Sequence, residues 1–218
     1  VYDKEGNEID QYVSTNSNRL SVGMDEIPDY LGKAFVAIED QRFYQHNGID
    51  VKGILRAGYQ FLKTGGEEAQ GASTITQQLL KNTVFTDWTS EGDNKIKKIK
   101  RKIQEQYLAL EITKYYSKDE ILLRYMNAIN LGQNTLGVES ASLRYFGKHC
   151  SDLTLSECAV IASITQNPSK YNPIRHPEDN AVRREKCLNK MLELGFVSQS
   201  EYDEAMADTD AVYERIGL

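Results

Sequence analysis

Hydrophobic residues recur at helical spacing through most of this chain, and strand-like alternation is scarce. Segments 28–38, 51–63 and 94–116 each repeat apolar positions three or four residues apart, which is typical of amphipathic helices. The last segment is the longest, and its apolar positions form one stripe: Ile96, Ile99, Ile103, Tyr107 and Leu110. Only the segment before Asp25 is expected to be extended, with a turn at Gly6-Asn7. The pattern predicts a mainly α fold.

Helix ends are marked by local signals. Pro28 is suited to the start of the first helix, and Thr64-Gly65-Gly66 to the end of the second. In a capping box, a Ser or Thr caps the helix start while a Glu three residues later reaches back. Three such pairs precede helical patterns in the second half: Ser117 with Glu120, Thr154 with Glu157, and Ser198 with Glu201.

The chain is expected to form a single domain over residues 1–218. Two polar segments, 64–71 and 86–94, are typical of mobile loops, and they bracket a predicted helix at 73–82. This arrangement indicates a small flexible lobe. Apolar runs such as residues 34–38 are far shorter than the roughly 18 residues that cross a bilayer, so no transmembrane helix is expected in this chain.

Composition and charge exclude several function classes. The net charge of -6 argues against general nucleic-acid binding. The three cysteines are odd in number and lack CxxC spacing, which excludes a disulfide framework or zinc knuckle, and Cys158 and Cys187 fit small core positions. The three histidines form no HExxH motif, so a tightly held catalytic metal is not expected.

The first candidate for chemistry is Glu39, which follows five apolar residues and precedes Asp40, Arg42 and His46. Removal of a carboxylate from water favours its protonated form and makes it a better base near neutral pH. The alternative is an ordinary surface helix end, where acidic residues are common. Spacing alone favours that alternative.

The second candidate is segment 70–82, a polar helix that opens on small residues and hydroxyls. Backbone N–H groups at a helix start, with Ser73 and Thr74 beside them, are suited to holding a phosphate. Helical spacing then predicts that one side carries Thr74, Gln77, Gln78, Lys81 and Asn82. An ordinary N-capped helix with a solvated face explains the segment about as well.

The third candidate is a run of cations. Six lysines and arginines occupy positions 95–102 at a helix start, where they oppose the helix dipole and repel one another. An anionic ligand would offset that cost. Lys97, Arg101 and Glu105 follow i, i+4, i+8 and share one face. The alternatives are a solvated charge run and a membrane-surface patch.

Five segments in order resemble the motifs of the peptidoglycan glycosyltransferase family, the domain found in class A penicillin-binding proteins and in monofunctional transglycosylases. The first three are residues 39–48, 71–82 and 101–105. The fourth spans 125–148, and the fifth runs from 155–157 through Pro168, Tyr171, Pro173 and Arg183. Each motif alone is weak evidence, but five in the right order are highly specific.

The resemblance implies a lysozyme-like fold with a large helical lobe and a smaller, membrane-facing lobe at about residues 59–100. It also implies that lipid II is polymerised into β-1,4-linked glycan with inversion and release of undecaprenyl pyrophosphate. Glu39 would be the general base that takes the proton from the acceptor's GlcNAc 4-hydroxyl, and that oxygen would attack C1 of the donor's MurNAc. Glu105 would orient the cations or help to activate the phosphate side.

The matching motifs carry over a set of substrate-binding residues: Asp40, Arg42, His46, Ser73, Thr74, Gln77, Gln78, Lys81, Asn82, Lys97, Arg101 and Lys102. No cofactor is required, although a loosely bound Mg²⁺ or Mn²⁺ is compatible with a pyrophosphate leaving group. The family commonly has an arginine before its third motif. Here the neighbouring cations are Lys95, Lys97 and Lys98, so a point charge replaces a bidentate fork.

The resemblance further implies a site at the extracytoplasmic face of the bacterial membrane. An N-terminal anchor helix is expected outside this sequence, and its partners would be lipid II, the growing lipid-linked glycan, the membrane surface and other cell-wall synthesis proteins. No serine is followed by a lysine three residues later, so no transpeptidase motif is present, although a bifunctional parent protein is favoured. The rival functions are a lysozyme-like lytic enzyme and a non-catalytic module that binds anionic lipid or glycan.

Overall fold

The computed structural model describes residues 20–64, 71, 73–85 and 95–217, and over these the protein is helical. The helices are α1 (Asp29–Glu39), α2 (Val51–Thr64), α3 (Ile75–Thr83), α4 (Lys95–Ile112), α5 (Lys118–Ala128), α6 (Val138–Phe146), α7 (Leu155–Ser163), α8 (Pro177–Glu193), α9 (Gln199–Ala207) and α10 (Thr209–Glu214). The described part has no strand, only an isolated bridge between Asn130 and Leu136. The mainly α prediction is confirmed. Most of the predicted extended segment, its Gly6-Asn7 turn and most of the two loops lie outside the described residues.

Helix starts follow the predicted capping chemistry. Ser117, Thr154 and Ser198 are the N-caps of α5, α7 and α9, and each accepts a hydrogen bond from the amide of the Glu three residues later. All three predicted capping boxes are therefore confirmed. A fourth box was not predicted as such: Thr74 caps α3 and pairs with Gln77. The helix predicted at 73–82 accordingly begins two residues later, at Ile75.

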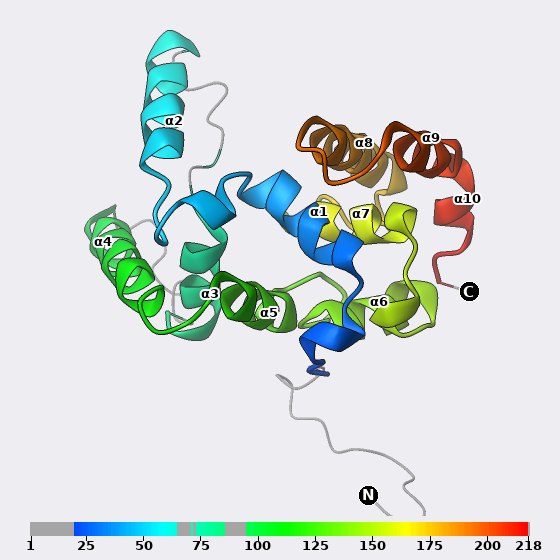
Figure 1. Cartoon of the computed structure of the whole chain (residues 1–218), viewed down its shortest axis with the longest axis horizontal. Coiled ribbons are helices and arrows are strands. Elements are labelled where there is room, and N and C mark those ends of the chain that lie inside the picture. Colours follow the sequence, from blue (N-terminus) through cyan, green and yellow to red (C-terminus); the bar gives the residue numbers. More distant parts are fainter. Residues whose placement is uncertain (1–19, 65–70, 72, 86–94, 218) are drawn as a thin grey trace, which may run out of the picture.

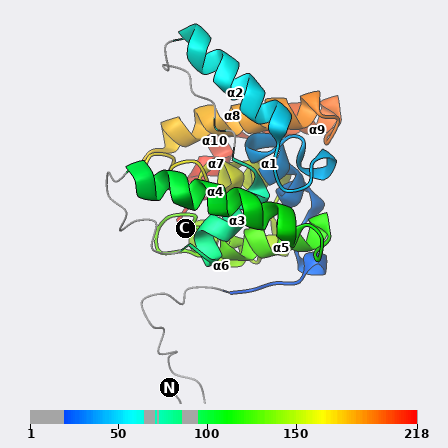
Figure 2. The same ribbon diagram turned by 90° about the vertical axis from the view of Figure 1, so that its left-hand side faces the viewer.

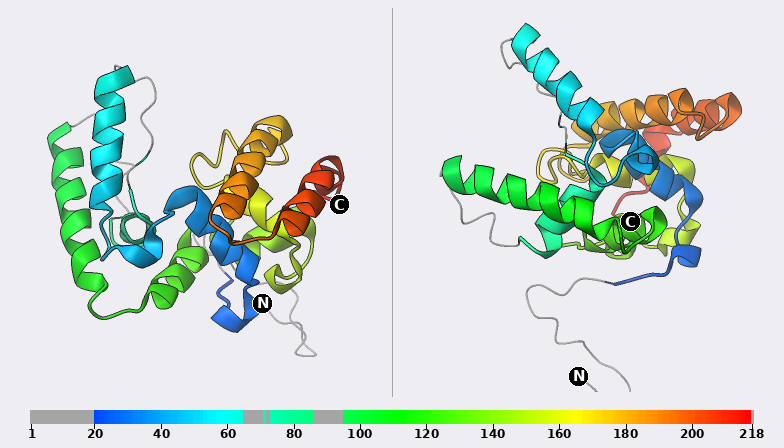
Figure 3. Two further views of the ribbon diagram at one scale, coloured as in Figure 1. Left: turned by 45° about the horizontal axis from the view of Figure 1, so that its top comes forward. Right: turned by 60° about the vertical axis from the view of Figure 1, so that its left-hand side comes forward.

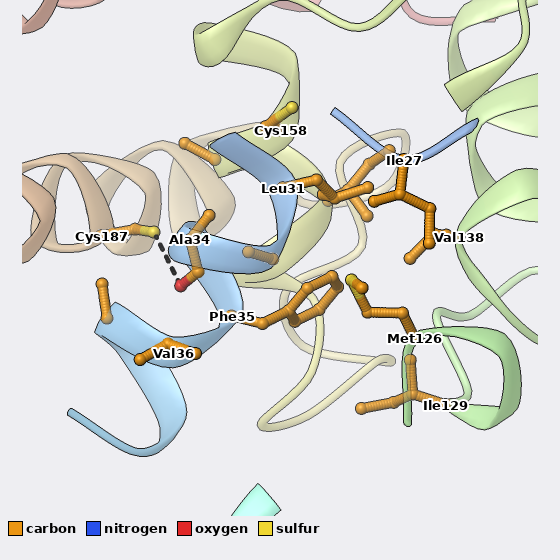
Figure 4. Close-up of a cluster of buried hydrophobic side chains, with 14 of the residues drawn as sticks. Ile27, Leu31, Ala34, Phe35, Val36, Met126, Ile129, Val138, Cys158 and Cys187 are labelled. Carbon is orange, nitrogen blue, oxygen red and sulfur yellow. Dashed lines mark hydrogen bonds between the residues drawn. The ribbon is translucent and has the colours of Figure 1, made fainter. Parts of the chain in front are cut away.

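The core is built around α7, in which every residue from Leu155 to Ser163 is buried. It packs against α1 and α8, and α9, α10 and α6 complete its surroundings (Figure 1). Helix α1 lies in the middle of this packing, and Figure 4 shows Leu31 and Phe35 pointing from it towards Val138 and Met126. The predicted core positions of Cys158 and Cys187 are confirmed, since both are fully buried.

Helices α3, α4 and α5 form a second group. Helix α3 packs against both α4 and α5, so it links the two (Figure 2). Helix α2 projects from the rest of the molecule in each view, and α2 and α4 lie on the side remote from α9 and α10 (Figures 1 and 3). The bounds of the smaller lobe, about residues 59–100, stay a prediction. Within the described residues, no helix is both long and apolar enough to cross a bilayer.

The apolar stripe predicted on 94–116 does lie on one helix, α4, but it faces outward. Its members are exposed by 42–79%: Ile96, Ile99, Ile103, Tyr107 and Leu110. Helix α2 also exposes large apolar side chains, with Leu55, Tyr59 and Leu62 at 68–83%. Monomeric soluble proteins rarely expose apolar residues in contiguous patches, and large patches of this kind often mark sites of interaction.

Candidate active site

Glu39 is the last residue of α1, where the buried apolar positions of that helix end. Its side chain is 11% exposed and receives donors from three distant segments. Arg183 Nη2 lies 2.9 Å from Oε1, Thr165 Oγ1 2.5 Å from the same oxygen, and Gln78 Nε2 2.8 Å from Oε2. These three contacts fix the orientation of the Glu39 carboxylate at the end of α1.

Asp40, which is buried, pairs with the half-buried His46 beside Glu39. His46 Nε2 lies 2.9 Å and 3.0 Å from the two Asp40 oxygens, while His46 Nδ1 accepts the Gly48 amide at 3.2 Å. Asp40 Oδ2 also accepts the amide of Ile75 at 3.0 Å, at the start of α3. A protein carboxylate therefore already occupies part of the helix terminus that was predicted to hold phosphate.

Arg42 is held by a fork of two hydrogen bonds to Asp50, at 3.2 Å from Nε and 2.5 Å from Nη2. Asp50 also accepts the amide of Gly53 at 2.9 Å, near the start of α2. Burial raises the pKa of Asp50, but the hydrogen bonds from Arg42 and Gly53 outweigh it and leave that pKa below its ordinary value. Arg42 thus links the loop after α1 to α2.

Residues of the second motif divide between structural and cavity-facing positions. The Thr74 hydroxyl donates to the Gly48 carbonyl at 2.7 Å, and Gln77 is buried with its side-chain oxygen on the Thr74 amide. Gln78 faces Glu39, and its side-chain oxygen accepts the Tyr125 hydroxyl at 3.2 Å. Lys81 and Asn82 are half-buried further along α3.

Glu105 is fully buried on α4 and pairs with cations of its own helix. Arg101 forms an ion pair with Oε1, and Lys102 Nζ lies 3.1 Å from Oε2 and 2.8 Å from the Ser73 hydroxyl. The predicted shared face of Arg101 and Glu105 is confirmed. Lys97, one turn earlier, is exposed. Lys102 connects this cluster to the segment that leads into α3.

A cavity of about 560 Å³ opens at the end of α1. Its walls come from the loop after α1, helix α2, the start of α3 and helix α8, and they include Glu39, Asp40, Arg42, Ser73, Thr74, Gln78, Arg183, Lys186 and Lys190. Six predicted site residues therefore share one cavity. His46, Gln77, Lys81, Asn82, Lys97, Arg101, Lys102 and Glu105 do not line it, and their contact with substrate stays a prediction.

Two residues that contact Glu39 were not among the predicted site residues. Arg183 and Thr165 are 144 and 126 residues from it along the chain, which only the tertiary fold can bring together. A signal for Arg183 exists, because it precedes Cys187 by one helical turn and so falls on the apolar face of its helix. A charged residue on such a face needs a buried partner. Thr165, in the loop after α7, carries no comparable signal.

Within the described residues, no cluster of three or more His, Cys, Asp or Glu side chains is placed to hold a metal ion.

Comparison with known proteins places this geometry in context. A family model described as Transglycosylase matches residues 5–192. The chain belongs to the transglycosylase family. The resemblance drawn from the five motifs is thereby confirmed, and with it the assignment to the glycosyltransferase enzymes.

Curated relatives extend the match. Penicillin-binding protein 1A of Clostridium perfringens (strain 13 / Type A) is 44% identical over 218 residues, which cover 96% of this chain and 31% of that protein. Penicillin-binding protein 1F of Bacillus subtilis (strain 168) is 40% identical over 209 residues, or 96% of this chain and 28% of that protein. The chain thus spans about 28–31% of the length of these relatives.

A solved structure supports the fold class. The crystal structure of penicillin-binding protein 1A from Haemophilus influenzae is similar with a TM-score of 0.51 and 25% sequence identity. The likeness covers 94% of this chain and 19% of that one. A mainly helical, lysozyme-like fold is therefore confirmed at the level of the whole domain.

Proposed function

We propose that this chain polymerises lipid II into β-1,4-linked glycan, with Glu39 as the general base. The carboxylate lies at the edge of a cavity of about 560 Å³ and receives three hydrogen-bond donors. This observation carries the proposal, because the three donors fix the carboxylate at the edge of a cavity, where a general base has to be positioned.

The proposed step balances without a cofactor. Glu39 takes the proton of the acceptor's GlcNAc 4-hydroxyl, and the oxygen forms a bond to C1 of the donor's MurNAc as the C1–O bond to pyrophosphate breaks. The bonding electrons leave with undecaprenyl pyrophosphate, and the anomeric centre inverts. A divalent cation, Mg²⁺ or Mn²⁺, would bind only loosely, to the pyrophosphate.

Negative charge grows on the leaving pyrophosphate, and fixed cations stabilise such charge best. The Glu105 cluster suits this role because the buried carboxylate holds Arg101 and Lys102 on one face of α4. The contact between Lys102 and Ser73 joins the cluster to the cavity wall. Glu105 would therefore orient cations rather than move a proton.

The lipid tails call for an apolar surface beside the cavity. Exposed apolar faces on α2 and α4 support contact with the outer surface of the bacterial membrane. On α4, Ile96, Ile99 and Ile103 line an apolar depression of about 300 Å³. An anchor helix and a transpeptidase domain in the parent protein, and partners among cell-wall synthesis proteins, belong to the same proposal.

A lysozyme-like lytic function is the second candidate. A lytic enzyme needs a protonated carboxyl group to donate to the leaving sugar oxygen. At Glu39, Arg183 and Thr165 both direct hydrogen-bond donors at Oε1, which is the arrangement of a hydrogen-bond acceptor. The basic cluster around Glu105 also has no partner in a reaction without diphosphate.

The test is incubation with lipid II, comparing wild type with Glu39→Gln and Glu105→Gln. We expect glycan polymer from the wild type, near-total loss in Glu39→Gln and severe loss in Glu105→Gln. Equal activity in all three proteins would overturn the mechanism. Cleavage of preformed glycan without polymerisation would select the lytic function.

A further inference from the structure

The two oxygens of Glu39 have unequal surroundings. Oε1 accepts two hydrogen bonds, from Arg183 and Thr165, whereas Oε2 accepts one, from Gln78. An ionised carboxylate offers about four lone-pair positions, two on each oxygen. In the described part of the chain, the contacts fill both positions of Oε1 and leave one on Oε2.

We infer that Oε2 is the atom of Glu39 that accepts the proton, and that Arg183 and Thr165 are positioning residues that hold Oε1. This inference rests on the proposed role of Glu39 as the base. It names the atom that performs that role and two side chains that act through it. With Oε1 held by two donors, the open lone-pair position on Oε2 is where the carboxylate receives the hydrogen of the acceptor's hydroxyl.

Arg183 is suited to positioning because each of its nitrogens has a separate partner. Nε donates to the Ser163 carbonyl at 3.0 Å and Nη1 to Gln166 at 2.6 Å, which leaves Nη2 for Glu39. The guanidinium also lies over the Tyr171 ring, at 5.2 Å from its centroid. The planar group is thus fixed between α7 and α8, an arrangement that a lysine cannot reproduce.

Thr165 adds a contact that responds to charge. Its Oγ1 lies 2.5 Å from Glu39 Oε1 and 3.0 Å from the Ala162 carbonyl, but a hydroxyl has one hydrogen to donate. An ionised carboxylate is the stronger acceptor, so the hydrogen points to Glu39 while that residue is charged. Once Oε2 takes a proton, this preference weakens. Thr165 therefore holds Oε1 in place while Oε2 faces the incoming proton.

Other groups around Glu39 affect its charge less directly. Asp40 follows it in the chain, and Tyr125 and Cys187 face it from α5 and α8. Burial raises the pKa of Tyr125 well above its ordinary value and that of Cys187 to about 12, so both side chains are neutral at physiological pH. The remaining charged groups line the cavity: Arg42, Asp50, Arg56, Lys186 and Lys190. Arg183 is the cation in direct contact with Glu39.

The first experiment measures lipid II polymerisation by Thr165→Val and Thr165→Ser. Valine keeps the side-chain shape but removes the hydroxyl. We expect kcat to fall about tenfold, the equivalent of one hydrogen bond to a charged group, with KM within about twofold of wild type. Serine restores the hydroxyl and should restore most of kcat. A wild-type kcat in Thr165→Val, or a serine variant no better than valine, would overturn the inference for Thr165.

The second experiment compares kcat and KM of Arg183→Lys and Arg183→Gln, with thermal unfolding by circular dichroism to confirm that each variant folds. Neither variant keeps the planar fork that holds Nη2 against Oε1 of Glu39. We therefore expect kcat to fall about tenfold in both variants, with KM within about twofold of wild type. A wild-type kcat in either variant, or a loss confined to KM, would reduce Arg183 to a structural role.

Glu39→Gln separates the two levels of inference. Full polymerisation by Glu39→Gln would refute the proposed base itself. An inactive Glu39→Gln beside fully active Thr165→Val and Arg183→Gln would leave the base intact and refute only the positioning roles.

Discussion

Glu39 and Glu105 are held by different kinds of contact. The donors to Glu39 lie 39, 126 and 144 residues away along the chain, on α3, after α7 and on α8. Glu105 pairs with Lys102 and Arg101, three and four residues earlier on its own helix. The first carboxylate is held by the tertiary fold, and the second by local helix geometry.

This difference matches the two tasks proposed for these carboxylates: proton transfer at Glu39 and charge stabilisation around Glu105. Proton transfer needs an atom fixed to within a fraction of an ångström, and Glu39 gains that precision from the core around α1 and α7. Charge stabilisation tolerates more movement, because cations act over several ångströms. The Glu105 cluster can therefore be carried on α4, whose outer face is apolar and exposed. The proposed base belongs to the core, and the cations proposed to face pyrophosphate belong to a helix at the surface.

The largest loss of stability is expected from truncating Phe35, a core side chain one helical turn before Glu39. Phe35 is fully buried on α1 and makes an edge contact with Tyr125, at 5.7 Å between ring centroids. Phe35→Ala should lower the free energy of unfolding by about 3–5 kcal/mol. The matched change on α4, Ile103→Ala, should alter it by no more than about 0.5 kcal/mol, since Ile103 is 62% exposed. Urea unfolding followed by circular dichroism measures both, and similar losses would erase the distinction between core and surface.

A smaller loss of stability is expected from a substitution at Gly48, where the loop after α1 packs against α4. Gly48 has φ +89°, and a Cβ there would lie 2.1 Å from the Ala109 carbonyl oxygen of α4. Gly195 has φ +69° with nothing within 4 Å of its Cβ position. Backbone strain should cost roughly 1–3 kcal/mol in either alanine variant. Gly48→Ala carries an added clash and should lose more stability, together with polymerising activity. Equal stability losses would mean that α4 moves freely away from the loop.

Local features of this fold could be predicted from the sequence, because their causes lie within a few residues. The capping boxes at Ser117, Thr154 and Ser198 and the ion pair of Arg101 with Glu105 depend only on helical spacing. The outward direction of the α4 stripe could not be predicted in this way. Periodicity identifies an apolar face but does not state what covers it.

The candidate site was predictable only in part, for the same reason. Glu39 and Gln78 were singled out from separate motifs, yet their contact at 2.8 Å depends on how α1 packs beside α3. The Arg183 and Thr165 contacts combine segments that no local pattern connects. A phosphate site was predicted at the start of α3. There, the amide of Ile75 donates instead to Asp40, which lies 35 residues earlier in the sequence.

The smallest change in stability is expected from acid, which should distinguish a carboxylate held by tertiary contacts from one held by its own helix. Glu157 is buried on α7 and bound by Lys148 at 2.7 Å and Arg215 at 3.2 Å, whereas Glu120 is exposed and caps its own helix. Burial raises the pKa of Glu157, but its hydrogen bonds outweigh this and leave the pKa below 4.5; hydrogen bonds with Ser117 lower that of Glu120. A lowered carboxyl pKa contributes stability above the ordinary value and loses it as pH falls.

Glu157→Gln should therefore destabilise the protein at pH 7 by about 1–3 kcal/mol, since it leaves buried donors without their charged partner. Glu120→Gln should have a smaller effect, because water replaces its contacts. Both differences from wild type should shrink as the pH falls below 4.5, the ordinary value for glutamate. Urea midpoints measured from pH 7 to pH 3 provide the check. A Glu157→Gln deficit that stays constant into acid would show that packing, rather than charge, holds α7 to its neighbours.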